Sequence, residues 1–113
     1  MAKEDITHMI ERLEAFEDRV GVTLEGLFAS TDDGYVGEKY WLAVNGELHP
    51  KEGTELGQSI NVVLTAYDST GRVIGVASQY FDSKSFFAFE AFSLGVGIYG
   101  IPAAKVRVYP KTR

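Results

Sequence analysis

Two histidines, His8 and His49, are the side chains in this sequence best suited to acid–base catalysis or zinc binding. Zinc sites and catalytic triads need further histidines, cysteines, serines or carboxylates in matching positions. Neither histidine has a cysteine, histidine or aspartate at metal-ligand spacing, and no serine lies in a G-x-S-x-G motif. We therefore interpret both histidines as surface residues, expect no catalytic residue, and predict that the protein is not an enzyme.

Residues 32–34, Asp-Asp-Gly, resemble half of a calcium-binding loop. A full loop needs acidic oxygens at further alternating positions and a distant glutamate. Residues 35–38 break that pattern, although Asp68 and Asp82 could join the site in space. We expect a solvated turn here and no metal site.

Residues 95–102, GVGIYGIP, raise the question of a phosphate-binding loop. The stretch lacks the lysine of a P-loop, and the proline and β-rich residues after it do not begin a helix. We expect a long loop or a crossing between sheets, and no cofactor.

Glu90 is the carboxylate with the most unusual neighbours, because it lies within the aromatic stretch 86–92, FFAFEAF. The stretch is predicted to be a strand covered on both sides, where a carboxylate needs a partner such as Lys105 or Arg107. Alternatively, a helix packed on a curved sheet could enclose a pocket in which Glu90 acts as ligand contact or base. That pocket would be lined by the aromatic residues Trp41, Tyr80, Phe86, Phe87, Phe89 and Phe92.

Composition limits the classes of partner that this chain of 113 residues can have. The net charge is −5, so nucleic acid and anionic membrane surfaces are poor partners. The chain has no cysteine, which excludes disulfides and thiolate metal sites. Residues 1–20 do not form the continuous apolar core of a signal peptide, and no apolar run is long enough to span a membrane. We therefore expect a cytoplasmic protein.

The N-terminal residues carry an apolar stripe at spacings of three and four, which is typical of an amphipathic helix. Gly21 follows the stripe and is a natural stop. We predict a helix over residues 1–21 that is ordered, packs through the stripe, and contributes to a homodimer contact. The stripe consists of Ile6, Met9, Ile10, Leu13, Phe16 and Val20.

The single tryptophan, Trp41, lies in an alternating segment that predicts a half-buried strand over residues 40–48. Leu42 and Val44 point to one side of this strand, and Trp41 points to the other. We expect the N-terminal helix to cover Trp41, and otherwise Trp41 would be an exposed binding anchor.

Residues 60–81 read as a hairpin closed by a turn at residues 68–71, Asp-Ser-Thr-Gly. A three-residue loop ending in a left-handed glycine is the pattern that this turn matches. It predicts a register in which Ala66 opposes Ile74, Leu64 opposes Val76 and Ile60 opposes Tyr80. All of these residues are therefore expected on the core face.

Two more strands are predicted, over residues 22–30 and at the end of the chain, where Val106 and Val108 point inward. The segments "INVVLTAYDSTGRVIGVAS" (60–78) and "AAKVRVYP" (103–110) resemble the FxLYD-type domains, which are immunoglobulin-like sandwiches. The resemblance covers about half of the chain, and it implies a non-catalytic accessory module with no catalytic residues to carry over. The N-terminal helix and the "HPKEG" segment depart from that pattern.

Together these patterns predict a mainly β fold, an antiparallel immunoglobulin-like β-sandwich over residues 22–113 preceded by the helix over residues 1–21. The predicted function is a non-catalytic interaction module that acts by protein–protein contact, as a homo-oligomer. The alternative is a small apolar-ligand-binding α+β domain with Glu90 in an aromatic pocket. The residues expected to make the protein contact are Ile6, Met9, Leu13, Phe16 and Trp41.

Overall fold

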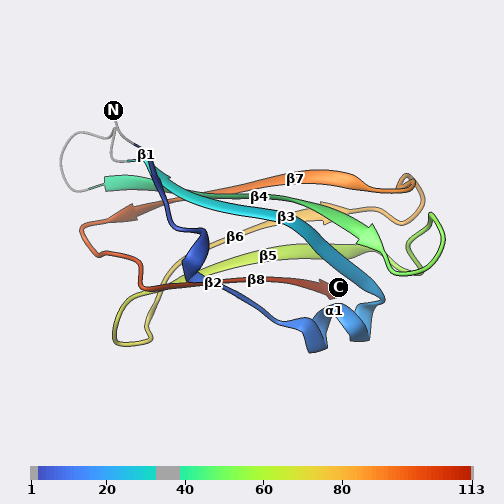
Figure 1. The fold of residues 1–113 in the computed structure, drawn as a ribbon, viewed down its shortest axis with the longest axis horizontal. Coiled ribbons are helices and arrows are strands. Elements are labelled where there is room, and N and C mark those ends of the chain that lie inside the picture. The colour runs from blue at the N-terminus through green and yellow to red at the C-terminus, as the bar shows by residue number, and fades with distance from the viewer. Residues whose placement is uncertain (1–2, 33–38, 113) are drawn as a thin grey trace.

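The computed structural model describes residues 3–32 and 39–112, and within these ranges the chain is mainly β (Figure 1). Its helical elements are a 3-10 turn, η1 (Thr7–Met9), and one short helix, α1 (Glu14–Val20). The strands are β1 (Lys3–Asp5), β2 (Ile10–Arg12), β3 (Val22–Asp32), β4 (Lys39–Pro50), β5 (Ile60–Tyr67), β6 (Val73–Phe81), β7 (Glu90–Tyr99) and β8 (Lys105–Thr112).

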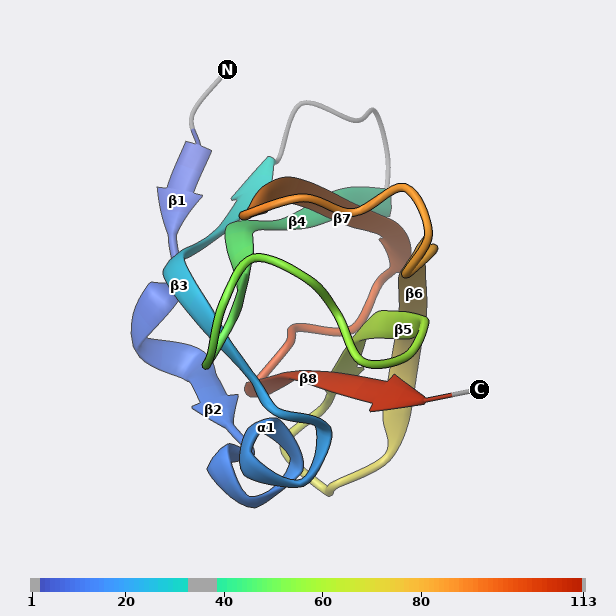
Figure 2. The ribbon, with the colours of Figure 1, turned by 90° about the vertical axis from the view of Figure 1, so that its right-hand side faces the viewer.

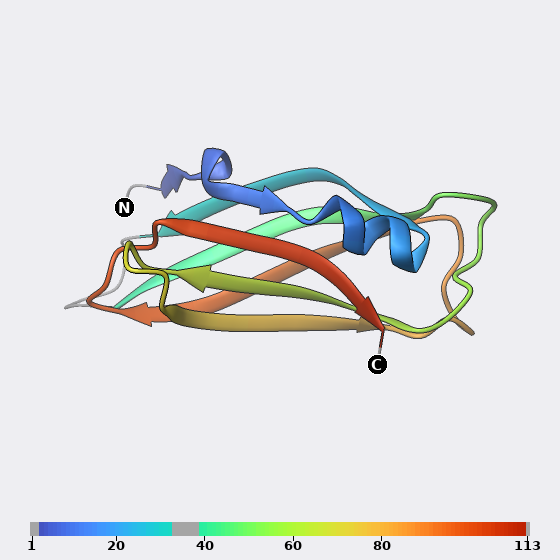
Figure 3. The same ribbon diagram turned by 90° about the horizontal axis from the view of Figure 1, so that it is seen from below.

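The strands form two sheets of four, which lie as two layers in the end-on view of Figure 2. In Figure 3 the molecule is seen from below, with β8, β5 and β6 in front of the strands of the other sheet. Sheet A has the order β1-β3-β4-β7, and sheet B has the order β2-β8-β5-β6. All pairs are antiparallel except β2 with β8, which run parallel. The prediction of a mainly β, antiparallel-rich fold with one helix is therefore confirmed.

The core lies between the sheets, because the strands alternate buried and exposed residues. Leu42 and Val44 of β4 are fully buried, as the alternation of residues 40–48 predicts. The inward positions of Val106 and Val108 on β8 are confirmed in the same way. The predicted strand at residues 22–30 is also confirmed, as β3.

The continuous helix predicted over residues 1–21 is wrong, because α1 begins at Glu14. The residues before it form β1, which pairs with β3, and β2, which pairs with β8. The backbone edges of β3 and β8 offer these residues hydrogen-bond partners outside any helix, and such tertiary pairing overrides a local helical pattern. The helix does end as predicted, at Gly21 with φ 81°.

The predicted turn at residues 68–71 is confirmed. The amide of Asp68 donates to the carbonyl of Arg72 at 3.0 Å, and the amide of Gly71 donates to the carbonyl of Asp68 at 3.1 Å. One carboxylate oxygen of Asp68 also accepts the amide and the hydroxyl of Thr70, at 2.8 and 2.7 Å. Gly71 takes φ 87°, the left-handed conformation that favours glycine.

The predicted register of this hairpin is wrong by one residue, because a β-bulge lies between Ala66 and Tyr67. Ala66 opposes Gly75 rather than Ile74, and Leu64 opposes Ala77 rather than Val76. A bulge inserts one extra residue, and a shift by one residue moves every side chain of the partner strand to the other face. Ile60 accordingly opposes Phe81, which is buried, and Tyr80 faces water.

The strand predicted over the aromatic stretch 86–92 begins later, at Glu90, and continues through the glycine-rich residues to Tyr99. The expectation of a loop or crossing at residues 95–102 is therefore wrong for its first half. Phe87 and Phe89 precede the strand and are exposed, so the stretch is not covered on both sides. Ala88 between them has φ 64°, which ends any extended run there.

Candidate functional site

The predicted contact residues do not share one surface. Ile6 is buried in the core, whereas Met9 and Leu13 are half-buried. Phe16 of α1 packs edge-on against Tyr109 of β8 with ring centroids 5.4 Å apart. Trp41 lies on sheet A and is 38% exposed, so the expected cover by the helix is wrong: α1 packs against β8 and β3 instead.

The candidate chemical groups stay apart as well. His8 is exposed on η1, and His49 lies near the end of β4. Asp33 and Gly34 of the calcium-like segment lie outside the described residues, and within residues 3–32 and 39–112 no group of three histidines or carboxylates is placed to hold a metal. Among the described helices, none is long and apolar enough to span a membrane.

The predicted partners of Glu90 bind another carboxylate. Arg107 and Lys105 point outward from β8 and reach Glu11 of β2, and both cations also lie over the ring of Tyr67, at 5.1 and 5.2 Å from its centroid. The hydrogen bond from Arg107 lowers the pKa of the Glu11 carboxyl, and that same bond raises the pKa of Arg107. This cluster stabilises the β2–β8 pair on the surface.

The aromatic residues of the alternative hypothesis also separate. Phe86 and Phe92 are buried in the core, where Phe86 meets Phe81 edge-on. Phe87 is 70% exposed, and Tyr80 faces water on sheet B. These side chains therefore do not surround one cavity with Glu90.

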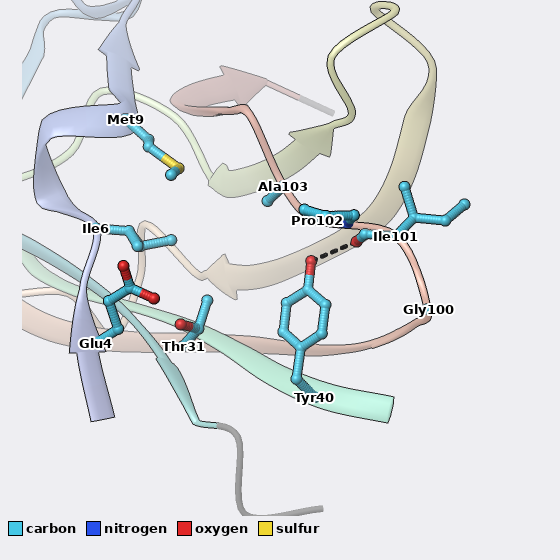
Figure 4. A pocket seen from close by; sticks show the side chains of 9 residues that line it. All are labelled: Glu4, Ile6, Met9, Thr31, Tyr40, Gly100, Ile101, Pro102 and Ala103. Atoms are coloured by element: carbon cyan, nitrogen blue, oxygen red, sulfur yellow. Dashed lines mark hydrogen bonds between the residues drawn. The ribbon is translucent and has the colours of Figure 1, made fainter. Parts of the chain in front are cut away.

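A pocket of about 520 Å³ opens at a different place, between the N-terminal segment and the connection from β7 to β8 (Figure 4). Tyr40 donates its hydroxyl to the carbonyl of Ile101 at 2.7 Å, and this bond closes one side of the pocket. Burial raises the pKa of the Tyr40 hydroxyl, although a backbone hydrogen bond with Ala103 opposes this effect. The lining is mostly apolar and comprises Glu4, Ile6, Met9, Thr31, Tyr40, Gly100, Ile101, Pro102 and Ala103.

The outer side of β6 is a second candidate surface. The shifted register turns Gly75, Ala77 and Gln79 toward the core, because they oppose the buried side of β5. Phe81 faces the core as well and is buried, whereas three other apolar residues of the strand face water. We call these three residues, Val73 (56% exposed), Val76 (58%) and Tyr80 (47%), the β6 patch.

The outer face of sheet A carries a third candidate, a depression of about 720 Å³ that we call the sheet A trough. The indole of Trp41 lies on the same face of the sheet, against Gly95 of the neighbouring strand. A Cβ atom added at Gly95 would be 2.7 Å from Cε2 and 2.8 Å from Nε1 of Trp41, so only glycine leaves room for the ring. The trough is lined by Gly26, Asn45, Gly46, Glu47, Gln79, Ala91, Phe92 and Ser93.

Sequence reasoning missed both the β6 patch and the trough. The patch depends on a bulge, and the trough joins outward positions of strands that are far apart in the sequence. The signal available for the trough was the row of small residues Ala91, Ser93, Gly95 and Gly97, which alternate along β7.

No family model and no curated protein matches this sequence. A solved structure that resembles the fold is that of a candidate beta-galactosidase from Bacteroides fragilis, with 13% sequence identity and a TM-score of 0.44. The match covers 78% of this chain and 16% of that chain. A likeness this distant carries no argument about activity or ligand, so the function is argued from the surfaces above.

Proposed function

We propose that this protein is a non-catalytic interaction module that binds a second copy of itself through the β6 patch. The observation that carries the proposal is the exposure of three large apolar side chains along β6. Gly75, Ala77, Gln79 and Phe81 oppose the buried side of β5, whereas Val73, Val76 and Tyr80 face water. Exposed apolar side chains grouped in this way are typical of interaction surfaces.

The neighbouring strand extends the apolar surface. Val63 of β5 is half-buried and shares the outward face of sheet B with Val76, across a shallow groove that Asn61, Ser78 and Lys111 also line. An apolar centre with a polar rim is the usual anatomy of a protein–protein interface. Fully burying one valine or tyrosine of this kind stabilises an interface by roughly 1.5–3 kcal/mol.

The charge distribution favours a second copy as the occupant. Residues 73–81 contain no charged side chain, although 24% of the chain is charged. Two β6 strands related by a two-fold axis would therefore meet without like-charge repulsion, and a two-fold contact uses the same surface on both copies.

The test is the mass of the protein in solution, measured by light scattering over a range of concentrations. We expect a dimer, and we expect Val76→Glu to convert it to a monomer while the far-UV circular dichroism stays unchanged. The matched control is Phe87→Glu, which places the same charge at an exposed apolar residue in the connection before β7. A monomeric wild-type protein, or a Val76→Glu protein that stays dimeric, would refute self-association through the patch.

Binding of a small apolar ligand is the second candidate function, and the pocket of Figure 4 favours it. Its volume of about 520 Å³ lies in the range of small-molecule sites. The experiment is titration with a fluorescent apolar dye, and Ala103→Trp is expected to fill the pocket and abolish the response. A response that survives in this variant would place the dye elsewhere.

We further propose that the two sheets form an immunoglobulin-like sandwich related to FxLYD-type domains. If the short strand β2 is left out of the count, β1 and β3 take the places of the first two strands of that fold, which are neighbours, and their pairing supports this proposal. The pairing of β3 with β4 in one sheet differs from it, because the second and third strands of an immunoglobulin domain lie in different sheets. A cytoplasmic location is proposed together with this assignment, on the composition of the chain alone. An experimental strand order tests the fold.

A further inference from the structure

The sheet A trough lies on outward-facing register pairs of β4 and β7. Trp41 opposes Gly97, and the next outward pairs are Ala43 with Gly95 and Asn45 with Ser93. The residues between them, such as Leu42 and Val44, are buried, so these pairs point away from the core. The indole leans over Gly95, and the Asn45–Ser93 pair is the next outward pair along the two strands.

The floor of the trough offers hydrogen-bonding groups that the protein leaves open. No hydrogen bond joins the side chains of Asn45 or Ser93 to another described residue, and both residues are exposed. Gln79 reaches round the edge of the sheet, where its side-chain oxygen accepts the amide of Ser93 at 3.4 Å. Its amide nitrogen keeps its two donor hydrogens, so the floor presents both donors and acceptors.

Aromatic rings flank this polar floor. Phe28 opposes Asn45 on β3 and is 44% exposed. At the end away from Trp41, the ring of His49 stacks on Phe89 with centroids 5.2 Å apart and planes 6° from parallel. The Nε2 atom of His49 also lies 3.0 Å from a carboxylate oxygen of Glu47, which holds that pair in place.

The chemistry of the trough selects a neutral, polyhydroxylated ligand. Its lining contains one carboxylate, Glu47, and no cation, so anionic groups such as phosphates are disfavoured. Amide and hydroxyl side chains pair well with hydroxyl groups, while an aromatic ring packs against an apolar face. A sugar ring combines an apolar face with a rim of hydroxyls.

A protein partner fits this face less well. The outward residues beside Trp41 include Ala43, Gly95 and Gly97, which offer little area to bury, and Lys39, whose flexible side chain lies over Gly97. A stable protein interface buries about 800 Å² on each partner around several large anchors. The apolar surface here is confined to rings spaced around polar groups.

We infer that the sheet A trough binds a neutral saccharide, with one sugar ring stacked on Trp41 and its hydroxyls bonded to Asn45 and Ser93. Apart from Gln79 of β6, the site lies on sheet A, and it shares no residue with the β6 patch, so the inference does not rest on self-association. Trp41 is the only tryptophan of the chain, and its fluorescence therefore reports directly on this site.

The experiment titrates the full chain with three neutral oligosaccharides, built from β-1,4-linked glucose, α-1,4-linked glucose and β-1,4-linked galactose. At least one is expected to give a saturable change in Trp41 fluorescence and in the amide NMR signals of Asn45 and Ser93. Asn45→Ala should weaken binding about tenfold, the loss of roughly 1.4 kcal/mol of hydrogen bonding. Trp41→Ala, followed by NMR, should weaken it by at least as much.

Two further variants show whether the sugar binds in the trough or elsewhere on the protein. Gly95→Ala keeps the tryptophan but displaces the indole, so it should also reduce binding, whereas Tyr80→Ala removes an exposed ring on the other sheet and should leave binding unchanged. A glucuronate oligosaccharide should bind more weakly than its neutral counterpart because of Glu47. The inference is overturned if none of the three sugars shifts the Asn45 and Ser93 signals, or if Trp41→Ala binds as the wild type does.

Discussion

Arg12 donates two hydrogen bonds to the buried carboxylate of Glu17, from Nη2 at 2.6 Å and from Nε at 3.2 Å. The carboxylate also accepts the backbone amide of Leu24 at 3.2 Å, and its side chain is 3% exposed. One ion pair therefore joins β2, α1 and β3. Glu17 was absent from the apolar stripe, yet it is the residue of α1 that is buried.

The Arg12–Glu17 pair predicts unequal effects of removing its two members. Arg12→Met leaves the carboxylate buried without its cation, and we expect a loss of about 3 kcal/mol in the free energy of unfolding. Glu17→Gln keeps an acceptor for Leu24 and leaves Arg12, which is 40% exposed, able to reach water. We expect this variant to lose about 1.5 kcal/mol in a urea melt. The double variant should match Glu17→Gln alone, and a double variant less stable than Arg12→Met would contradict this interpretation.

The N-terminal segment is attached to the core through Ile6. Its side chain is 2% exposed, and its amide donates to the carbonyl of Ala29 at 2.8 Å. Ile6→Ala is expected to lower the free energy of unfolding by about 2–4 kcal/mol, as for other buried aliphatic truncations. Leu13→Ala, at a half-buried position before α1, should cost less than about 2 kcal/mol. Equal costs at the two positions would favour the amphipathic helix that the sequence pattern predicts.

The left-handed conformation of Gly71 predicts that another residue at this position of the β5–β6 turn lowers the stability of the protein. Its φ of 87° is unfavourable for a β-branched residue, so Gly71→Val should destabilise the protein by roughly 1–2 kcal/mol. Gly57→Val is the matched control, because Gly57 lies in a loop outside the left-handed region with no atom near its Cβ position. We expect that control to stay within about 0.5 kcal/mol of the wild type. An unchanged denaturant midpoint for Gly71→Val would disprove the conformational argument.

The lowered pKa of the Asp68 carboxyl predicts that the stability of the protein depends on pH. The hydroxyl of Thr70, and then the amide of Arg72, lower the pKa of the Asp68 carboxyl from its usual 3.8. A carboxyl whose pKa is lower in the folded state stabilises the fold above its unfolded pKa, and this contribution is lost as pH falls through the folded pKa. The difference in urea midpoint between wild type and Asp68→Asn should therefore be full at neutral pH and shrink below about pH 3.8. A difference that stays constant down to about pH 2 would show that the charge of Asp68 does not contribute.

Strands with simple alternation could be predicted from the sequence, because their inward residues are apolar whatever the neighbouring strand does. Val44 and Val108 are examples. The strands of the N-terminal segment could not be predicted in this way, because its apolar spacing is that of a helix. These strands form only because β3 and β8 offer them backbone hydrogen-bond partners. At Thr7, for example, the hydroxyl accepts the amide of Ala29 at 3.1 Å, a contact between residues 22 positions apart.

The two candidate surfaces were harder to predict for a related reason. The turn at residues 68–71 follows from local chemistry, but the bulge beside Tyr67 decides which face of β6 meets water. The sheet A trough depends on a glycine, Gly95, whose absent side chain makes room for a tryptophan 54 positions earlier. The bulge could not be recognised from the hairpin residues alone, and the contact between Gly95 and Trp41 could not be recognised from either strand alone.

The parallel pairing of β2 with β8 determines how the fold responds to mechanical tension. Both strands run in the same direction along the 45 Å long axis, with the N-terminal side of β2 and the C-terminal side of β8 toward opposite ends (Figure 1). A pull on residues 3 and 112 therefore loads the pairs from Ile10–Val106 to Arg12–Val108 in shear, so their hydrogen bonds must break together rather than one after another. The Glu11–Arg107 contact lies within this pair and adds to its resistance. Part of the segment whose apolar spacing predicts a helix thus forms the strand pair that resists stretching.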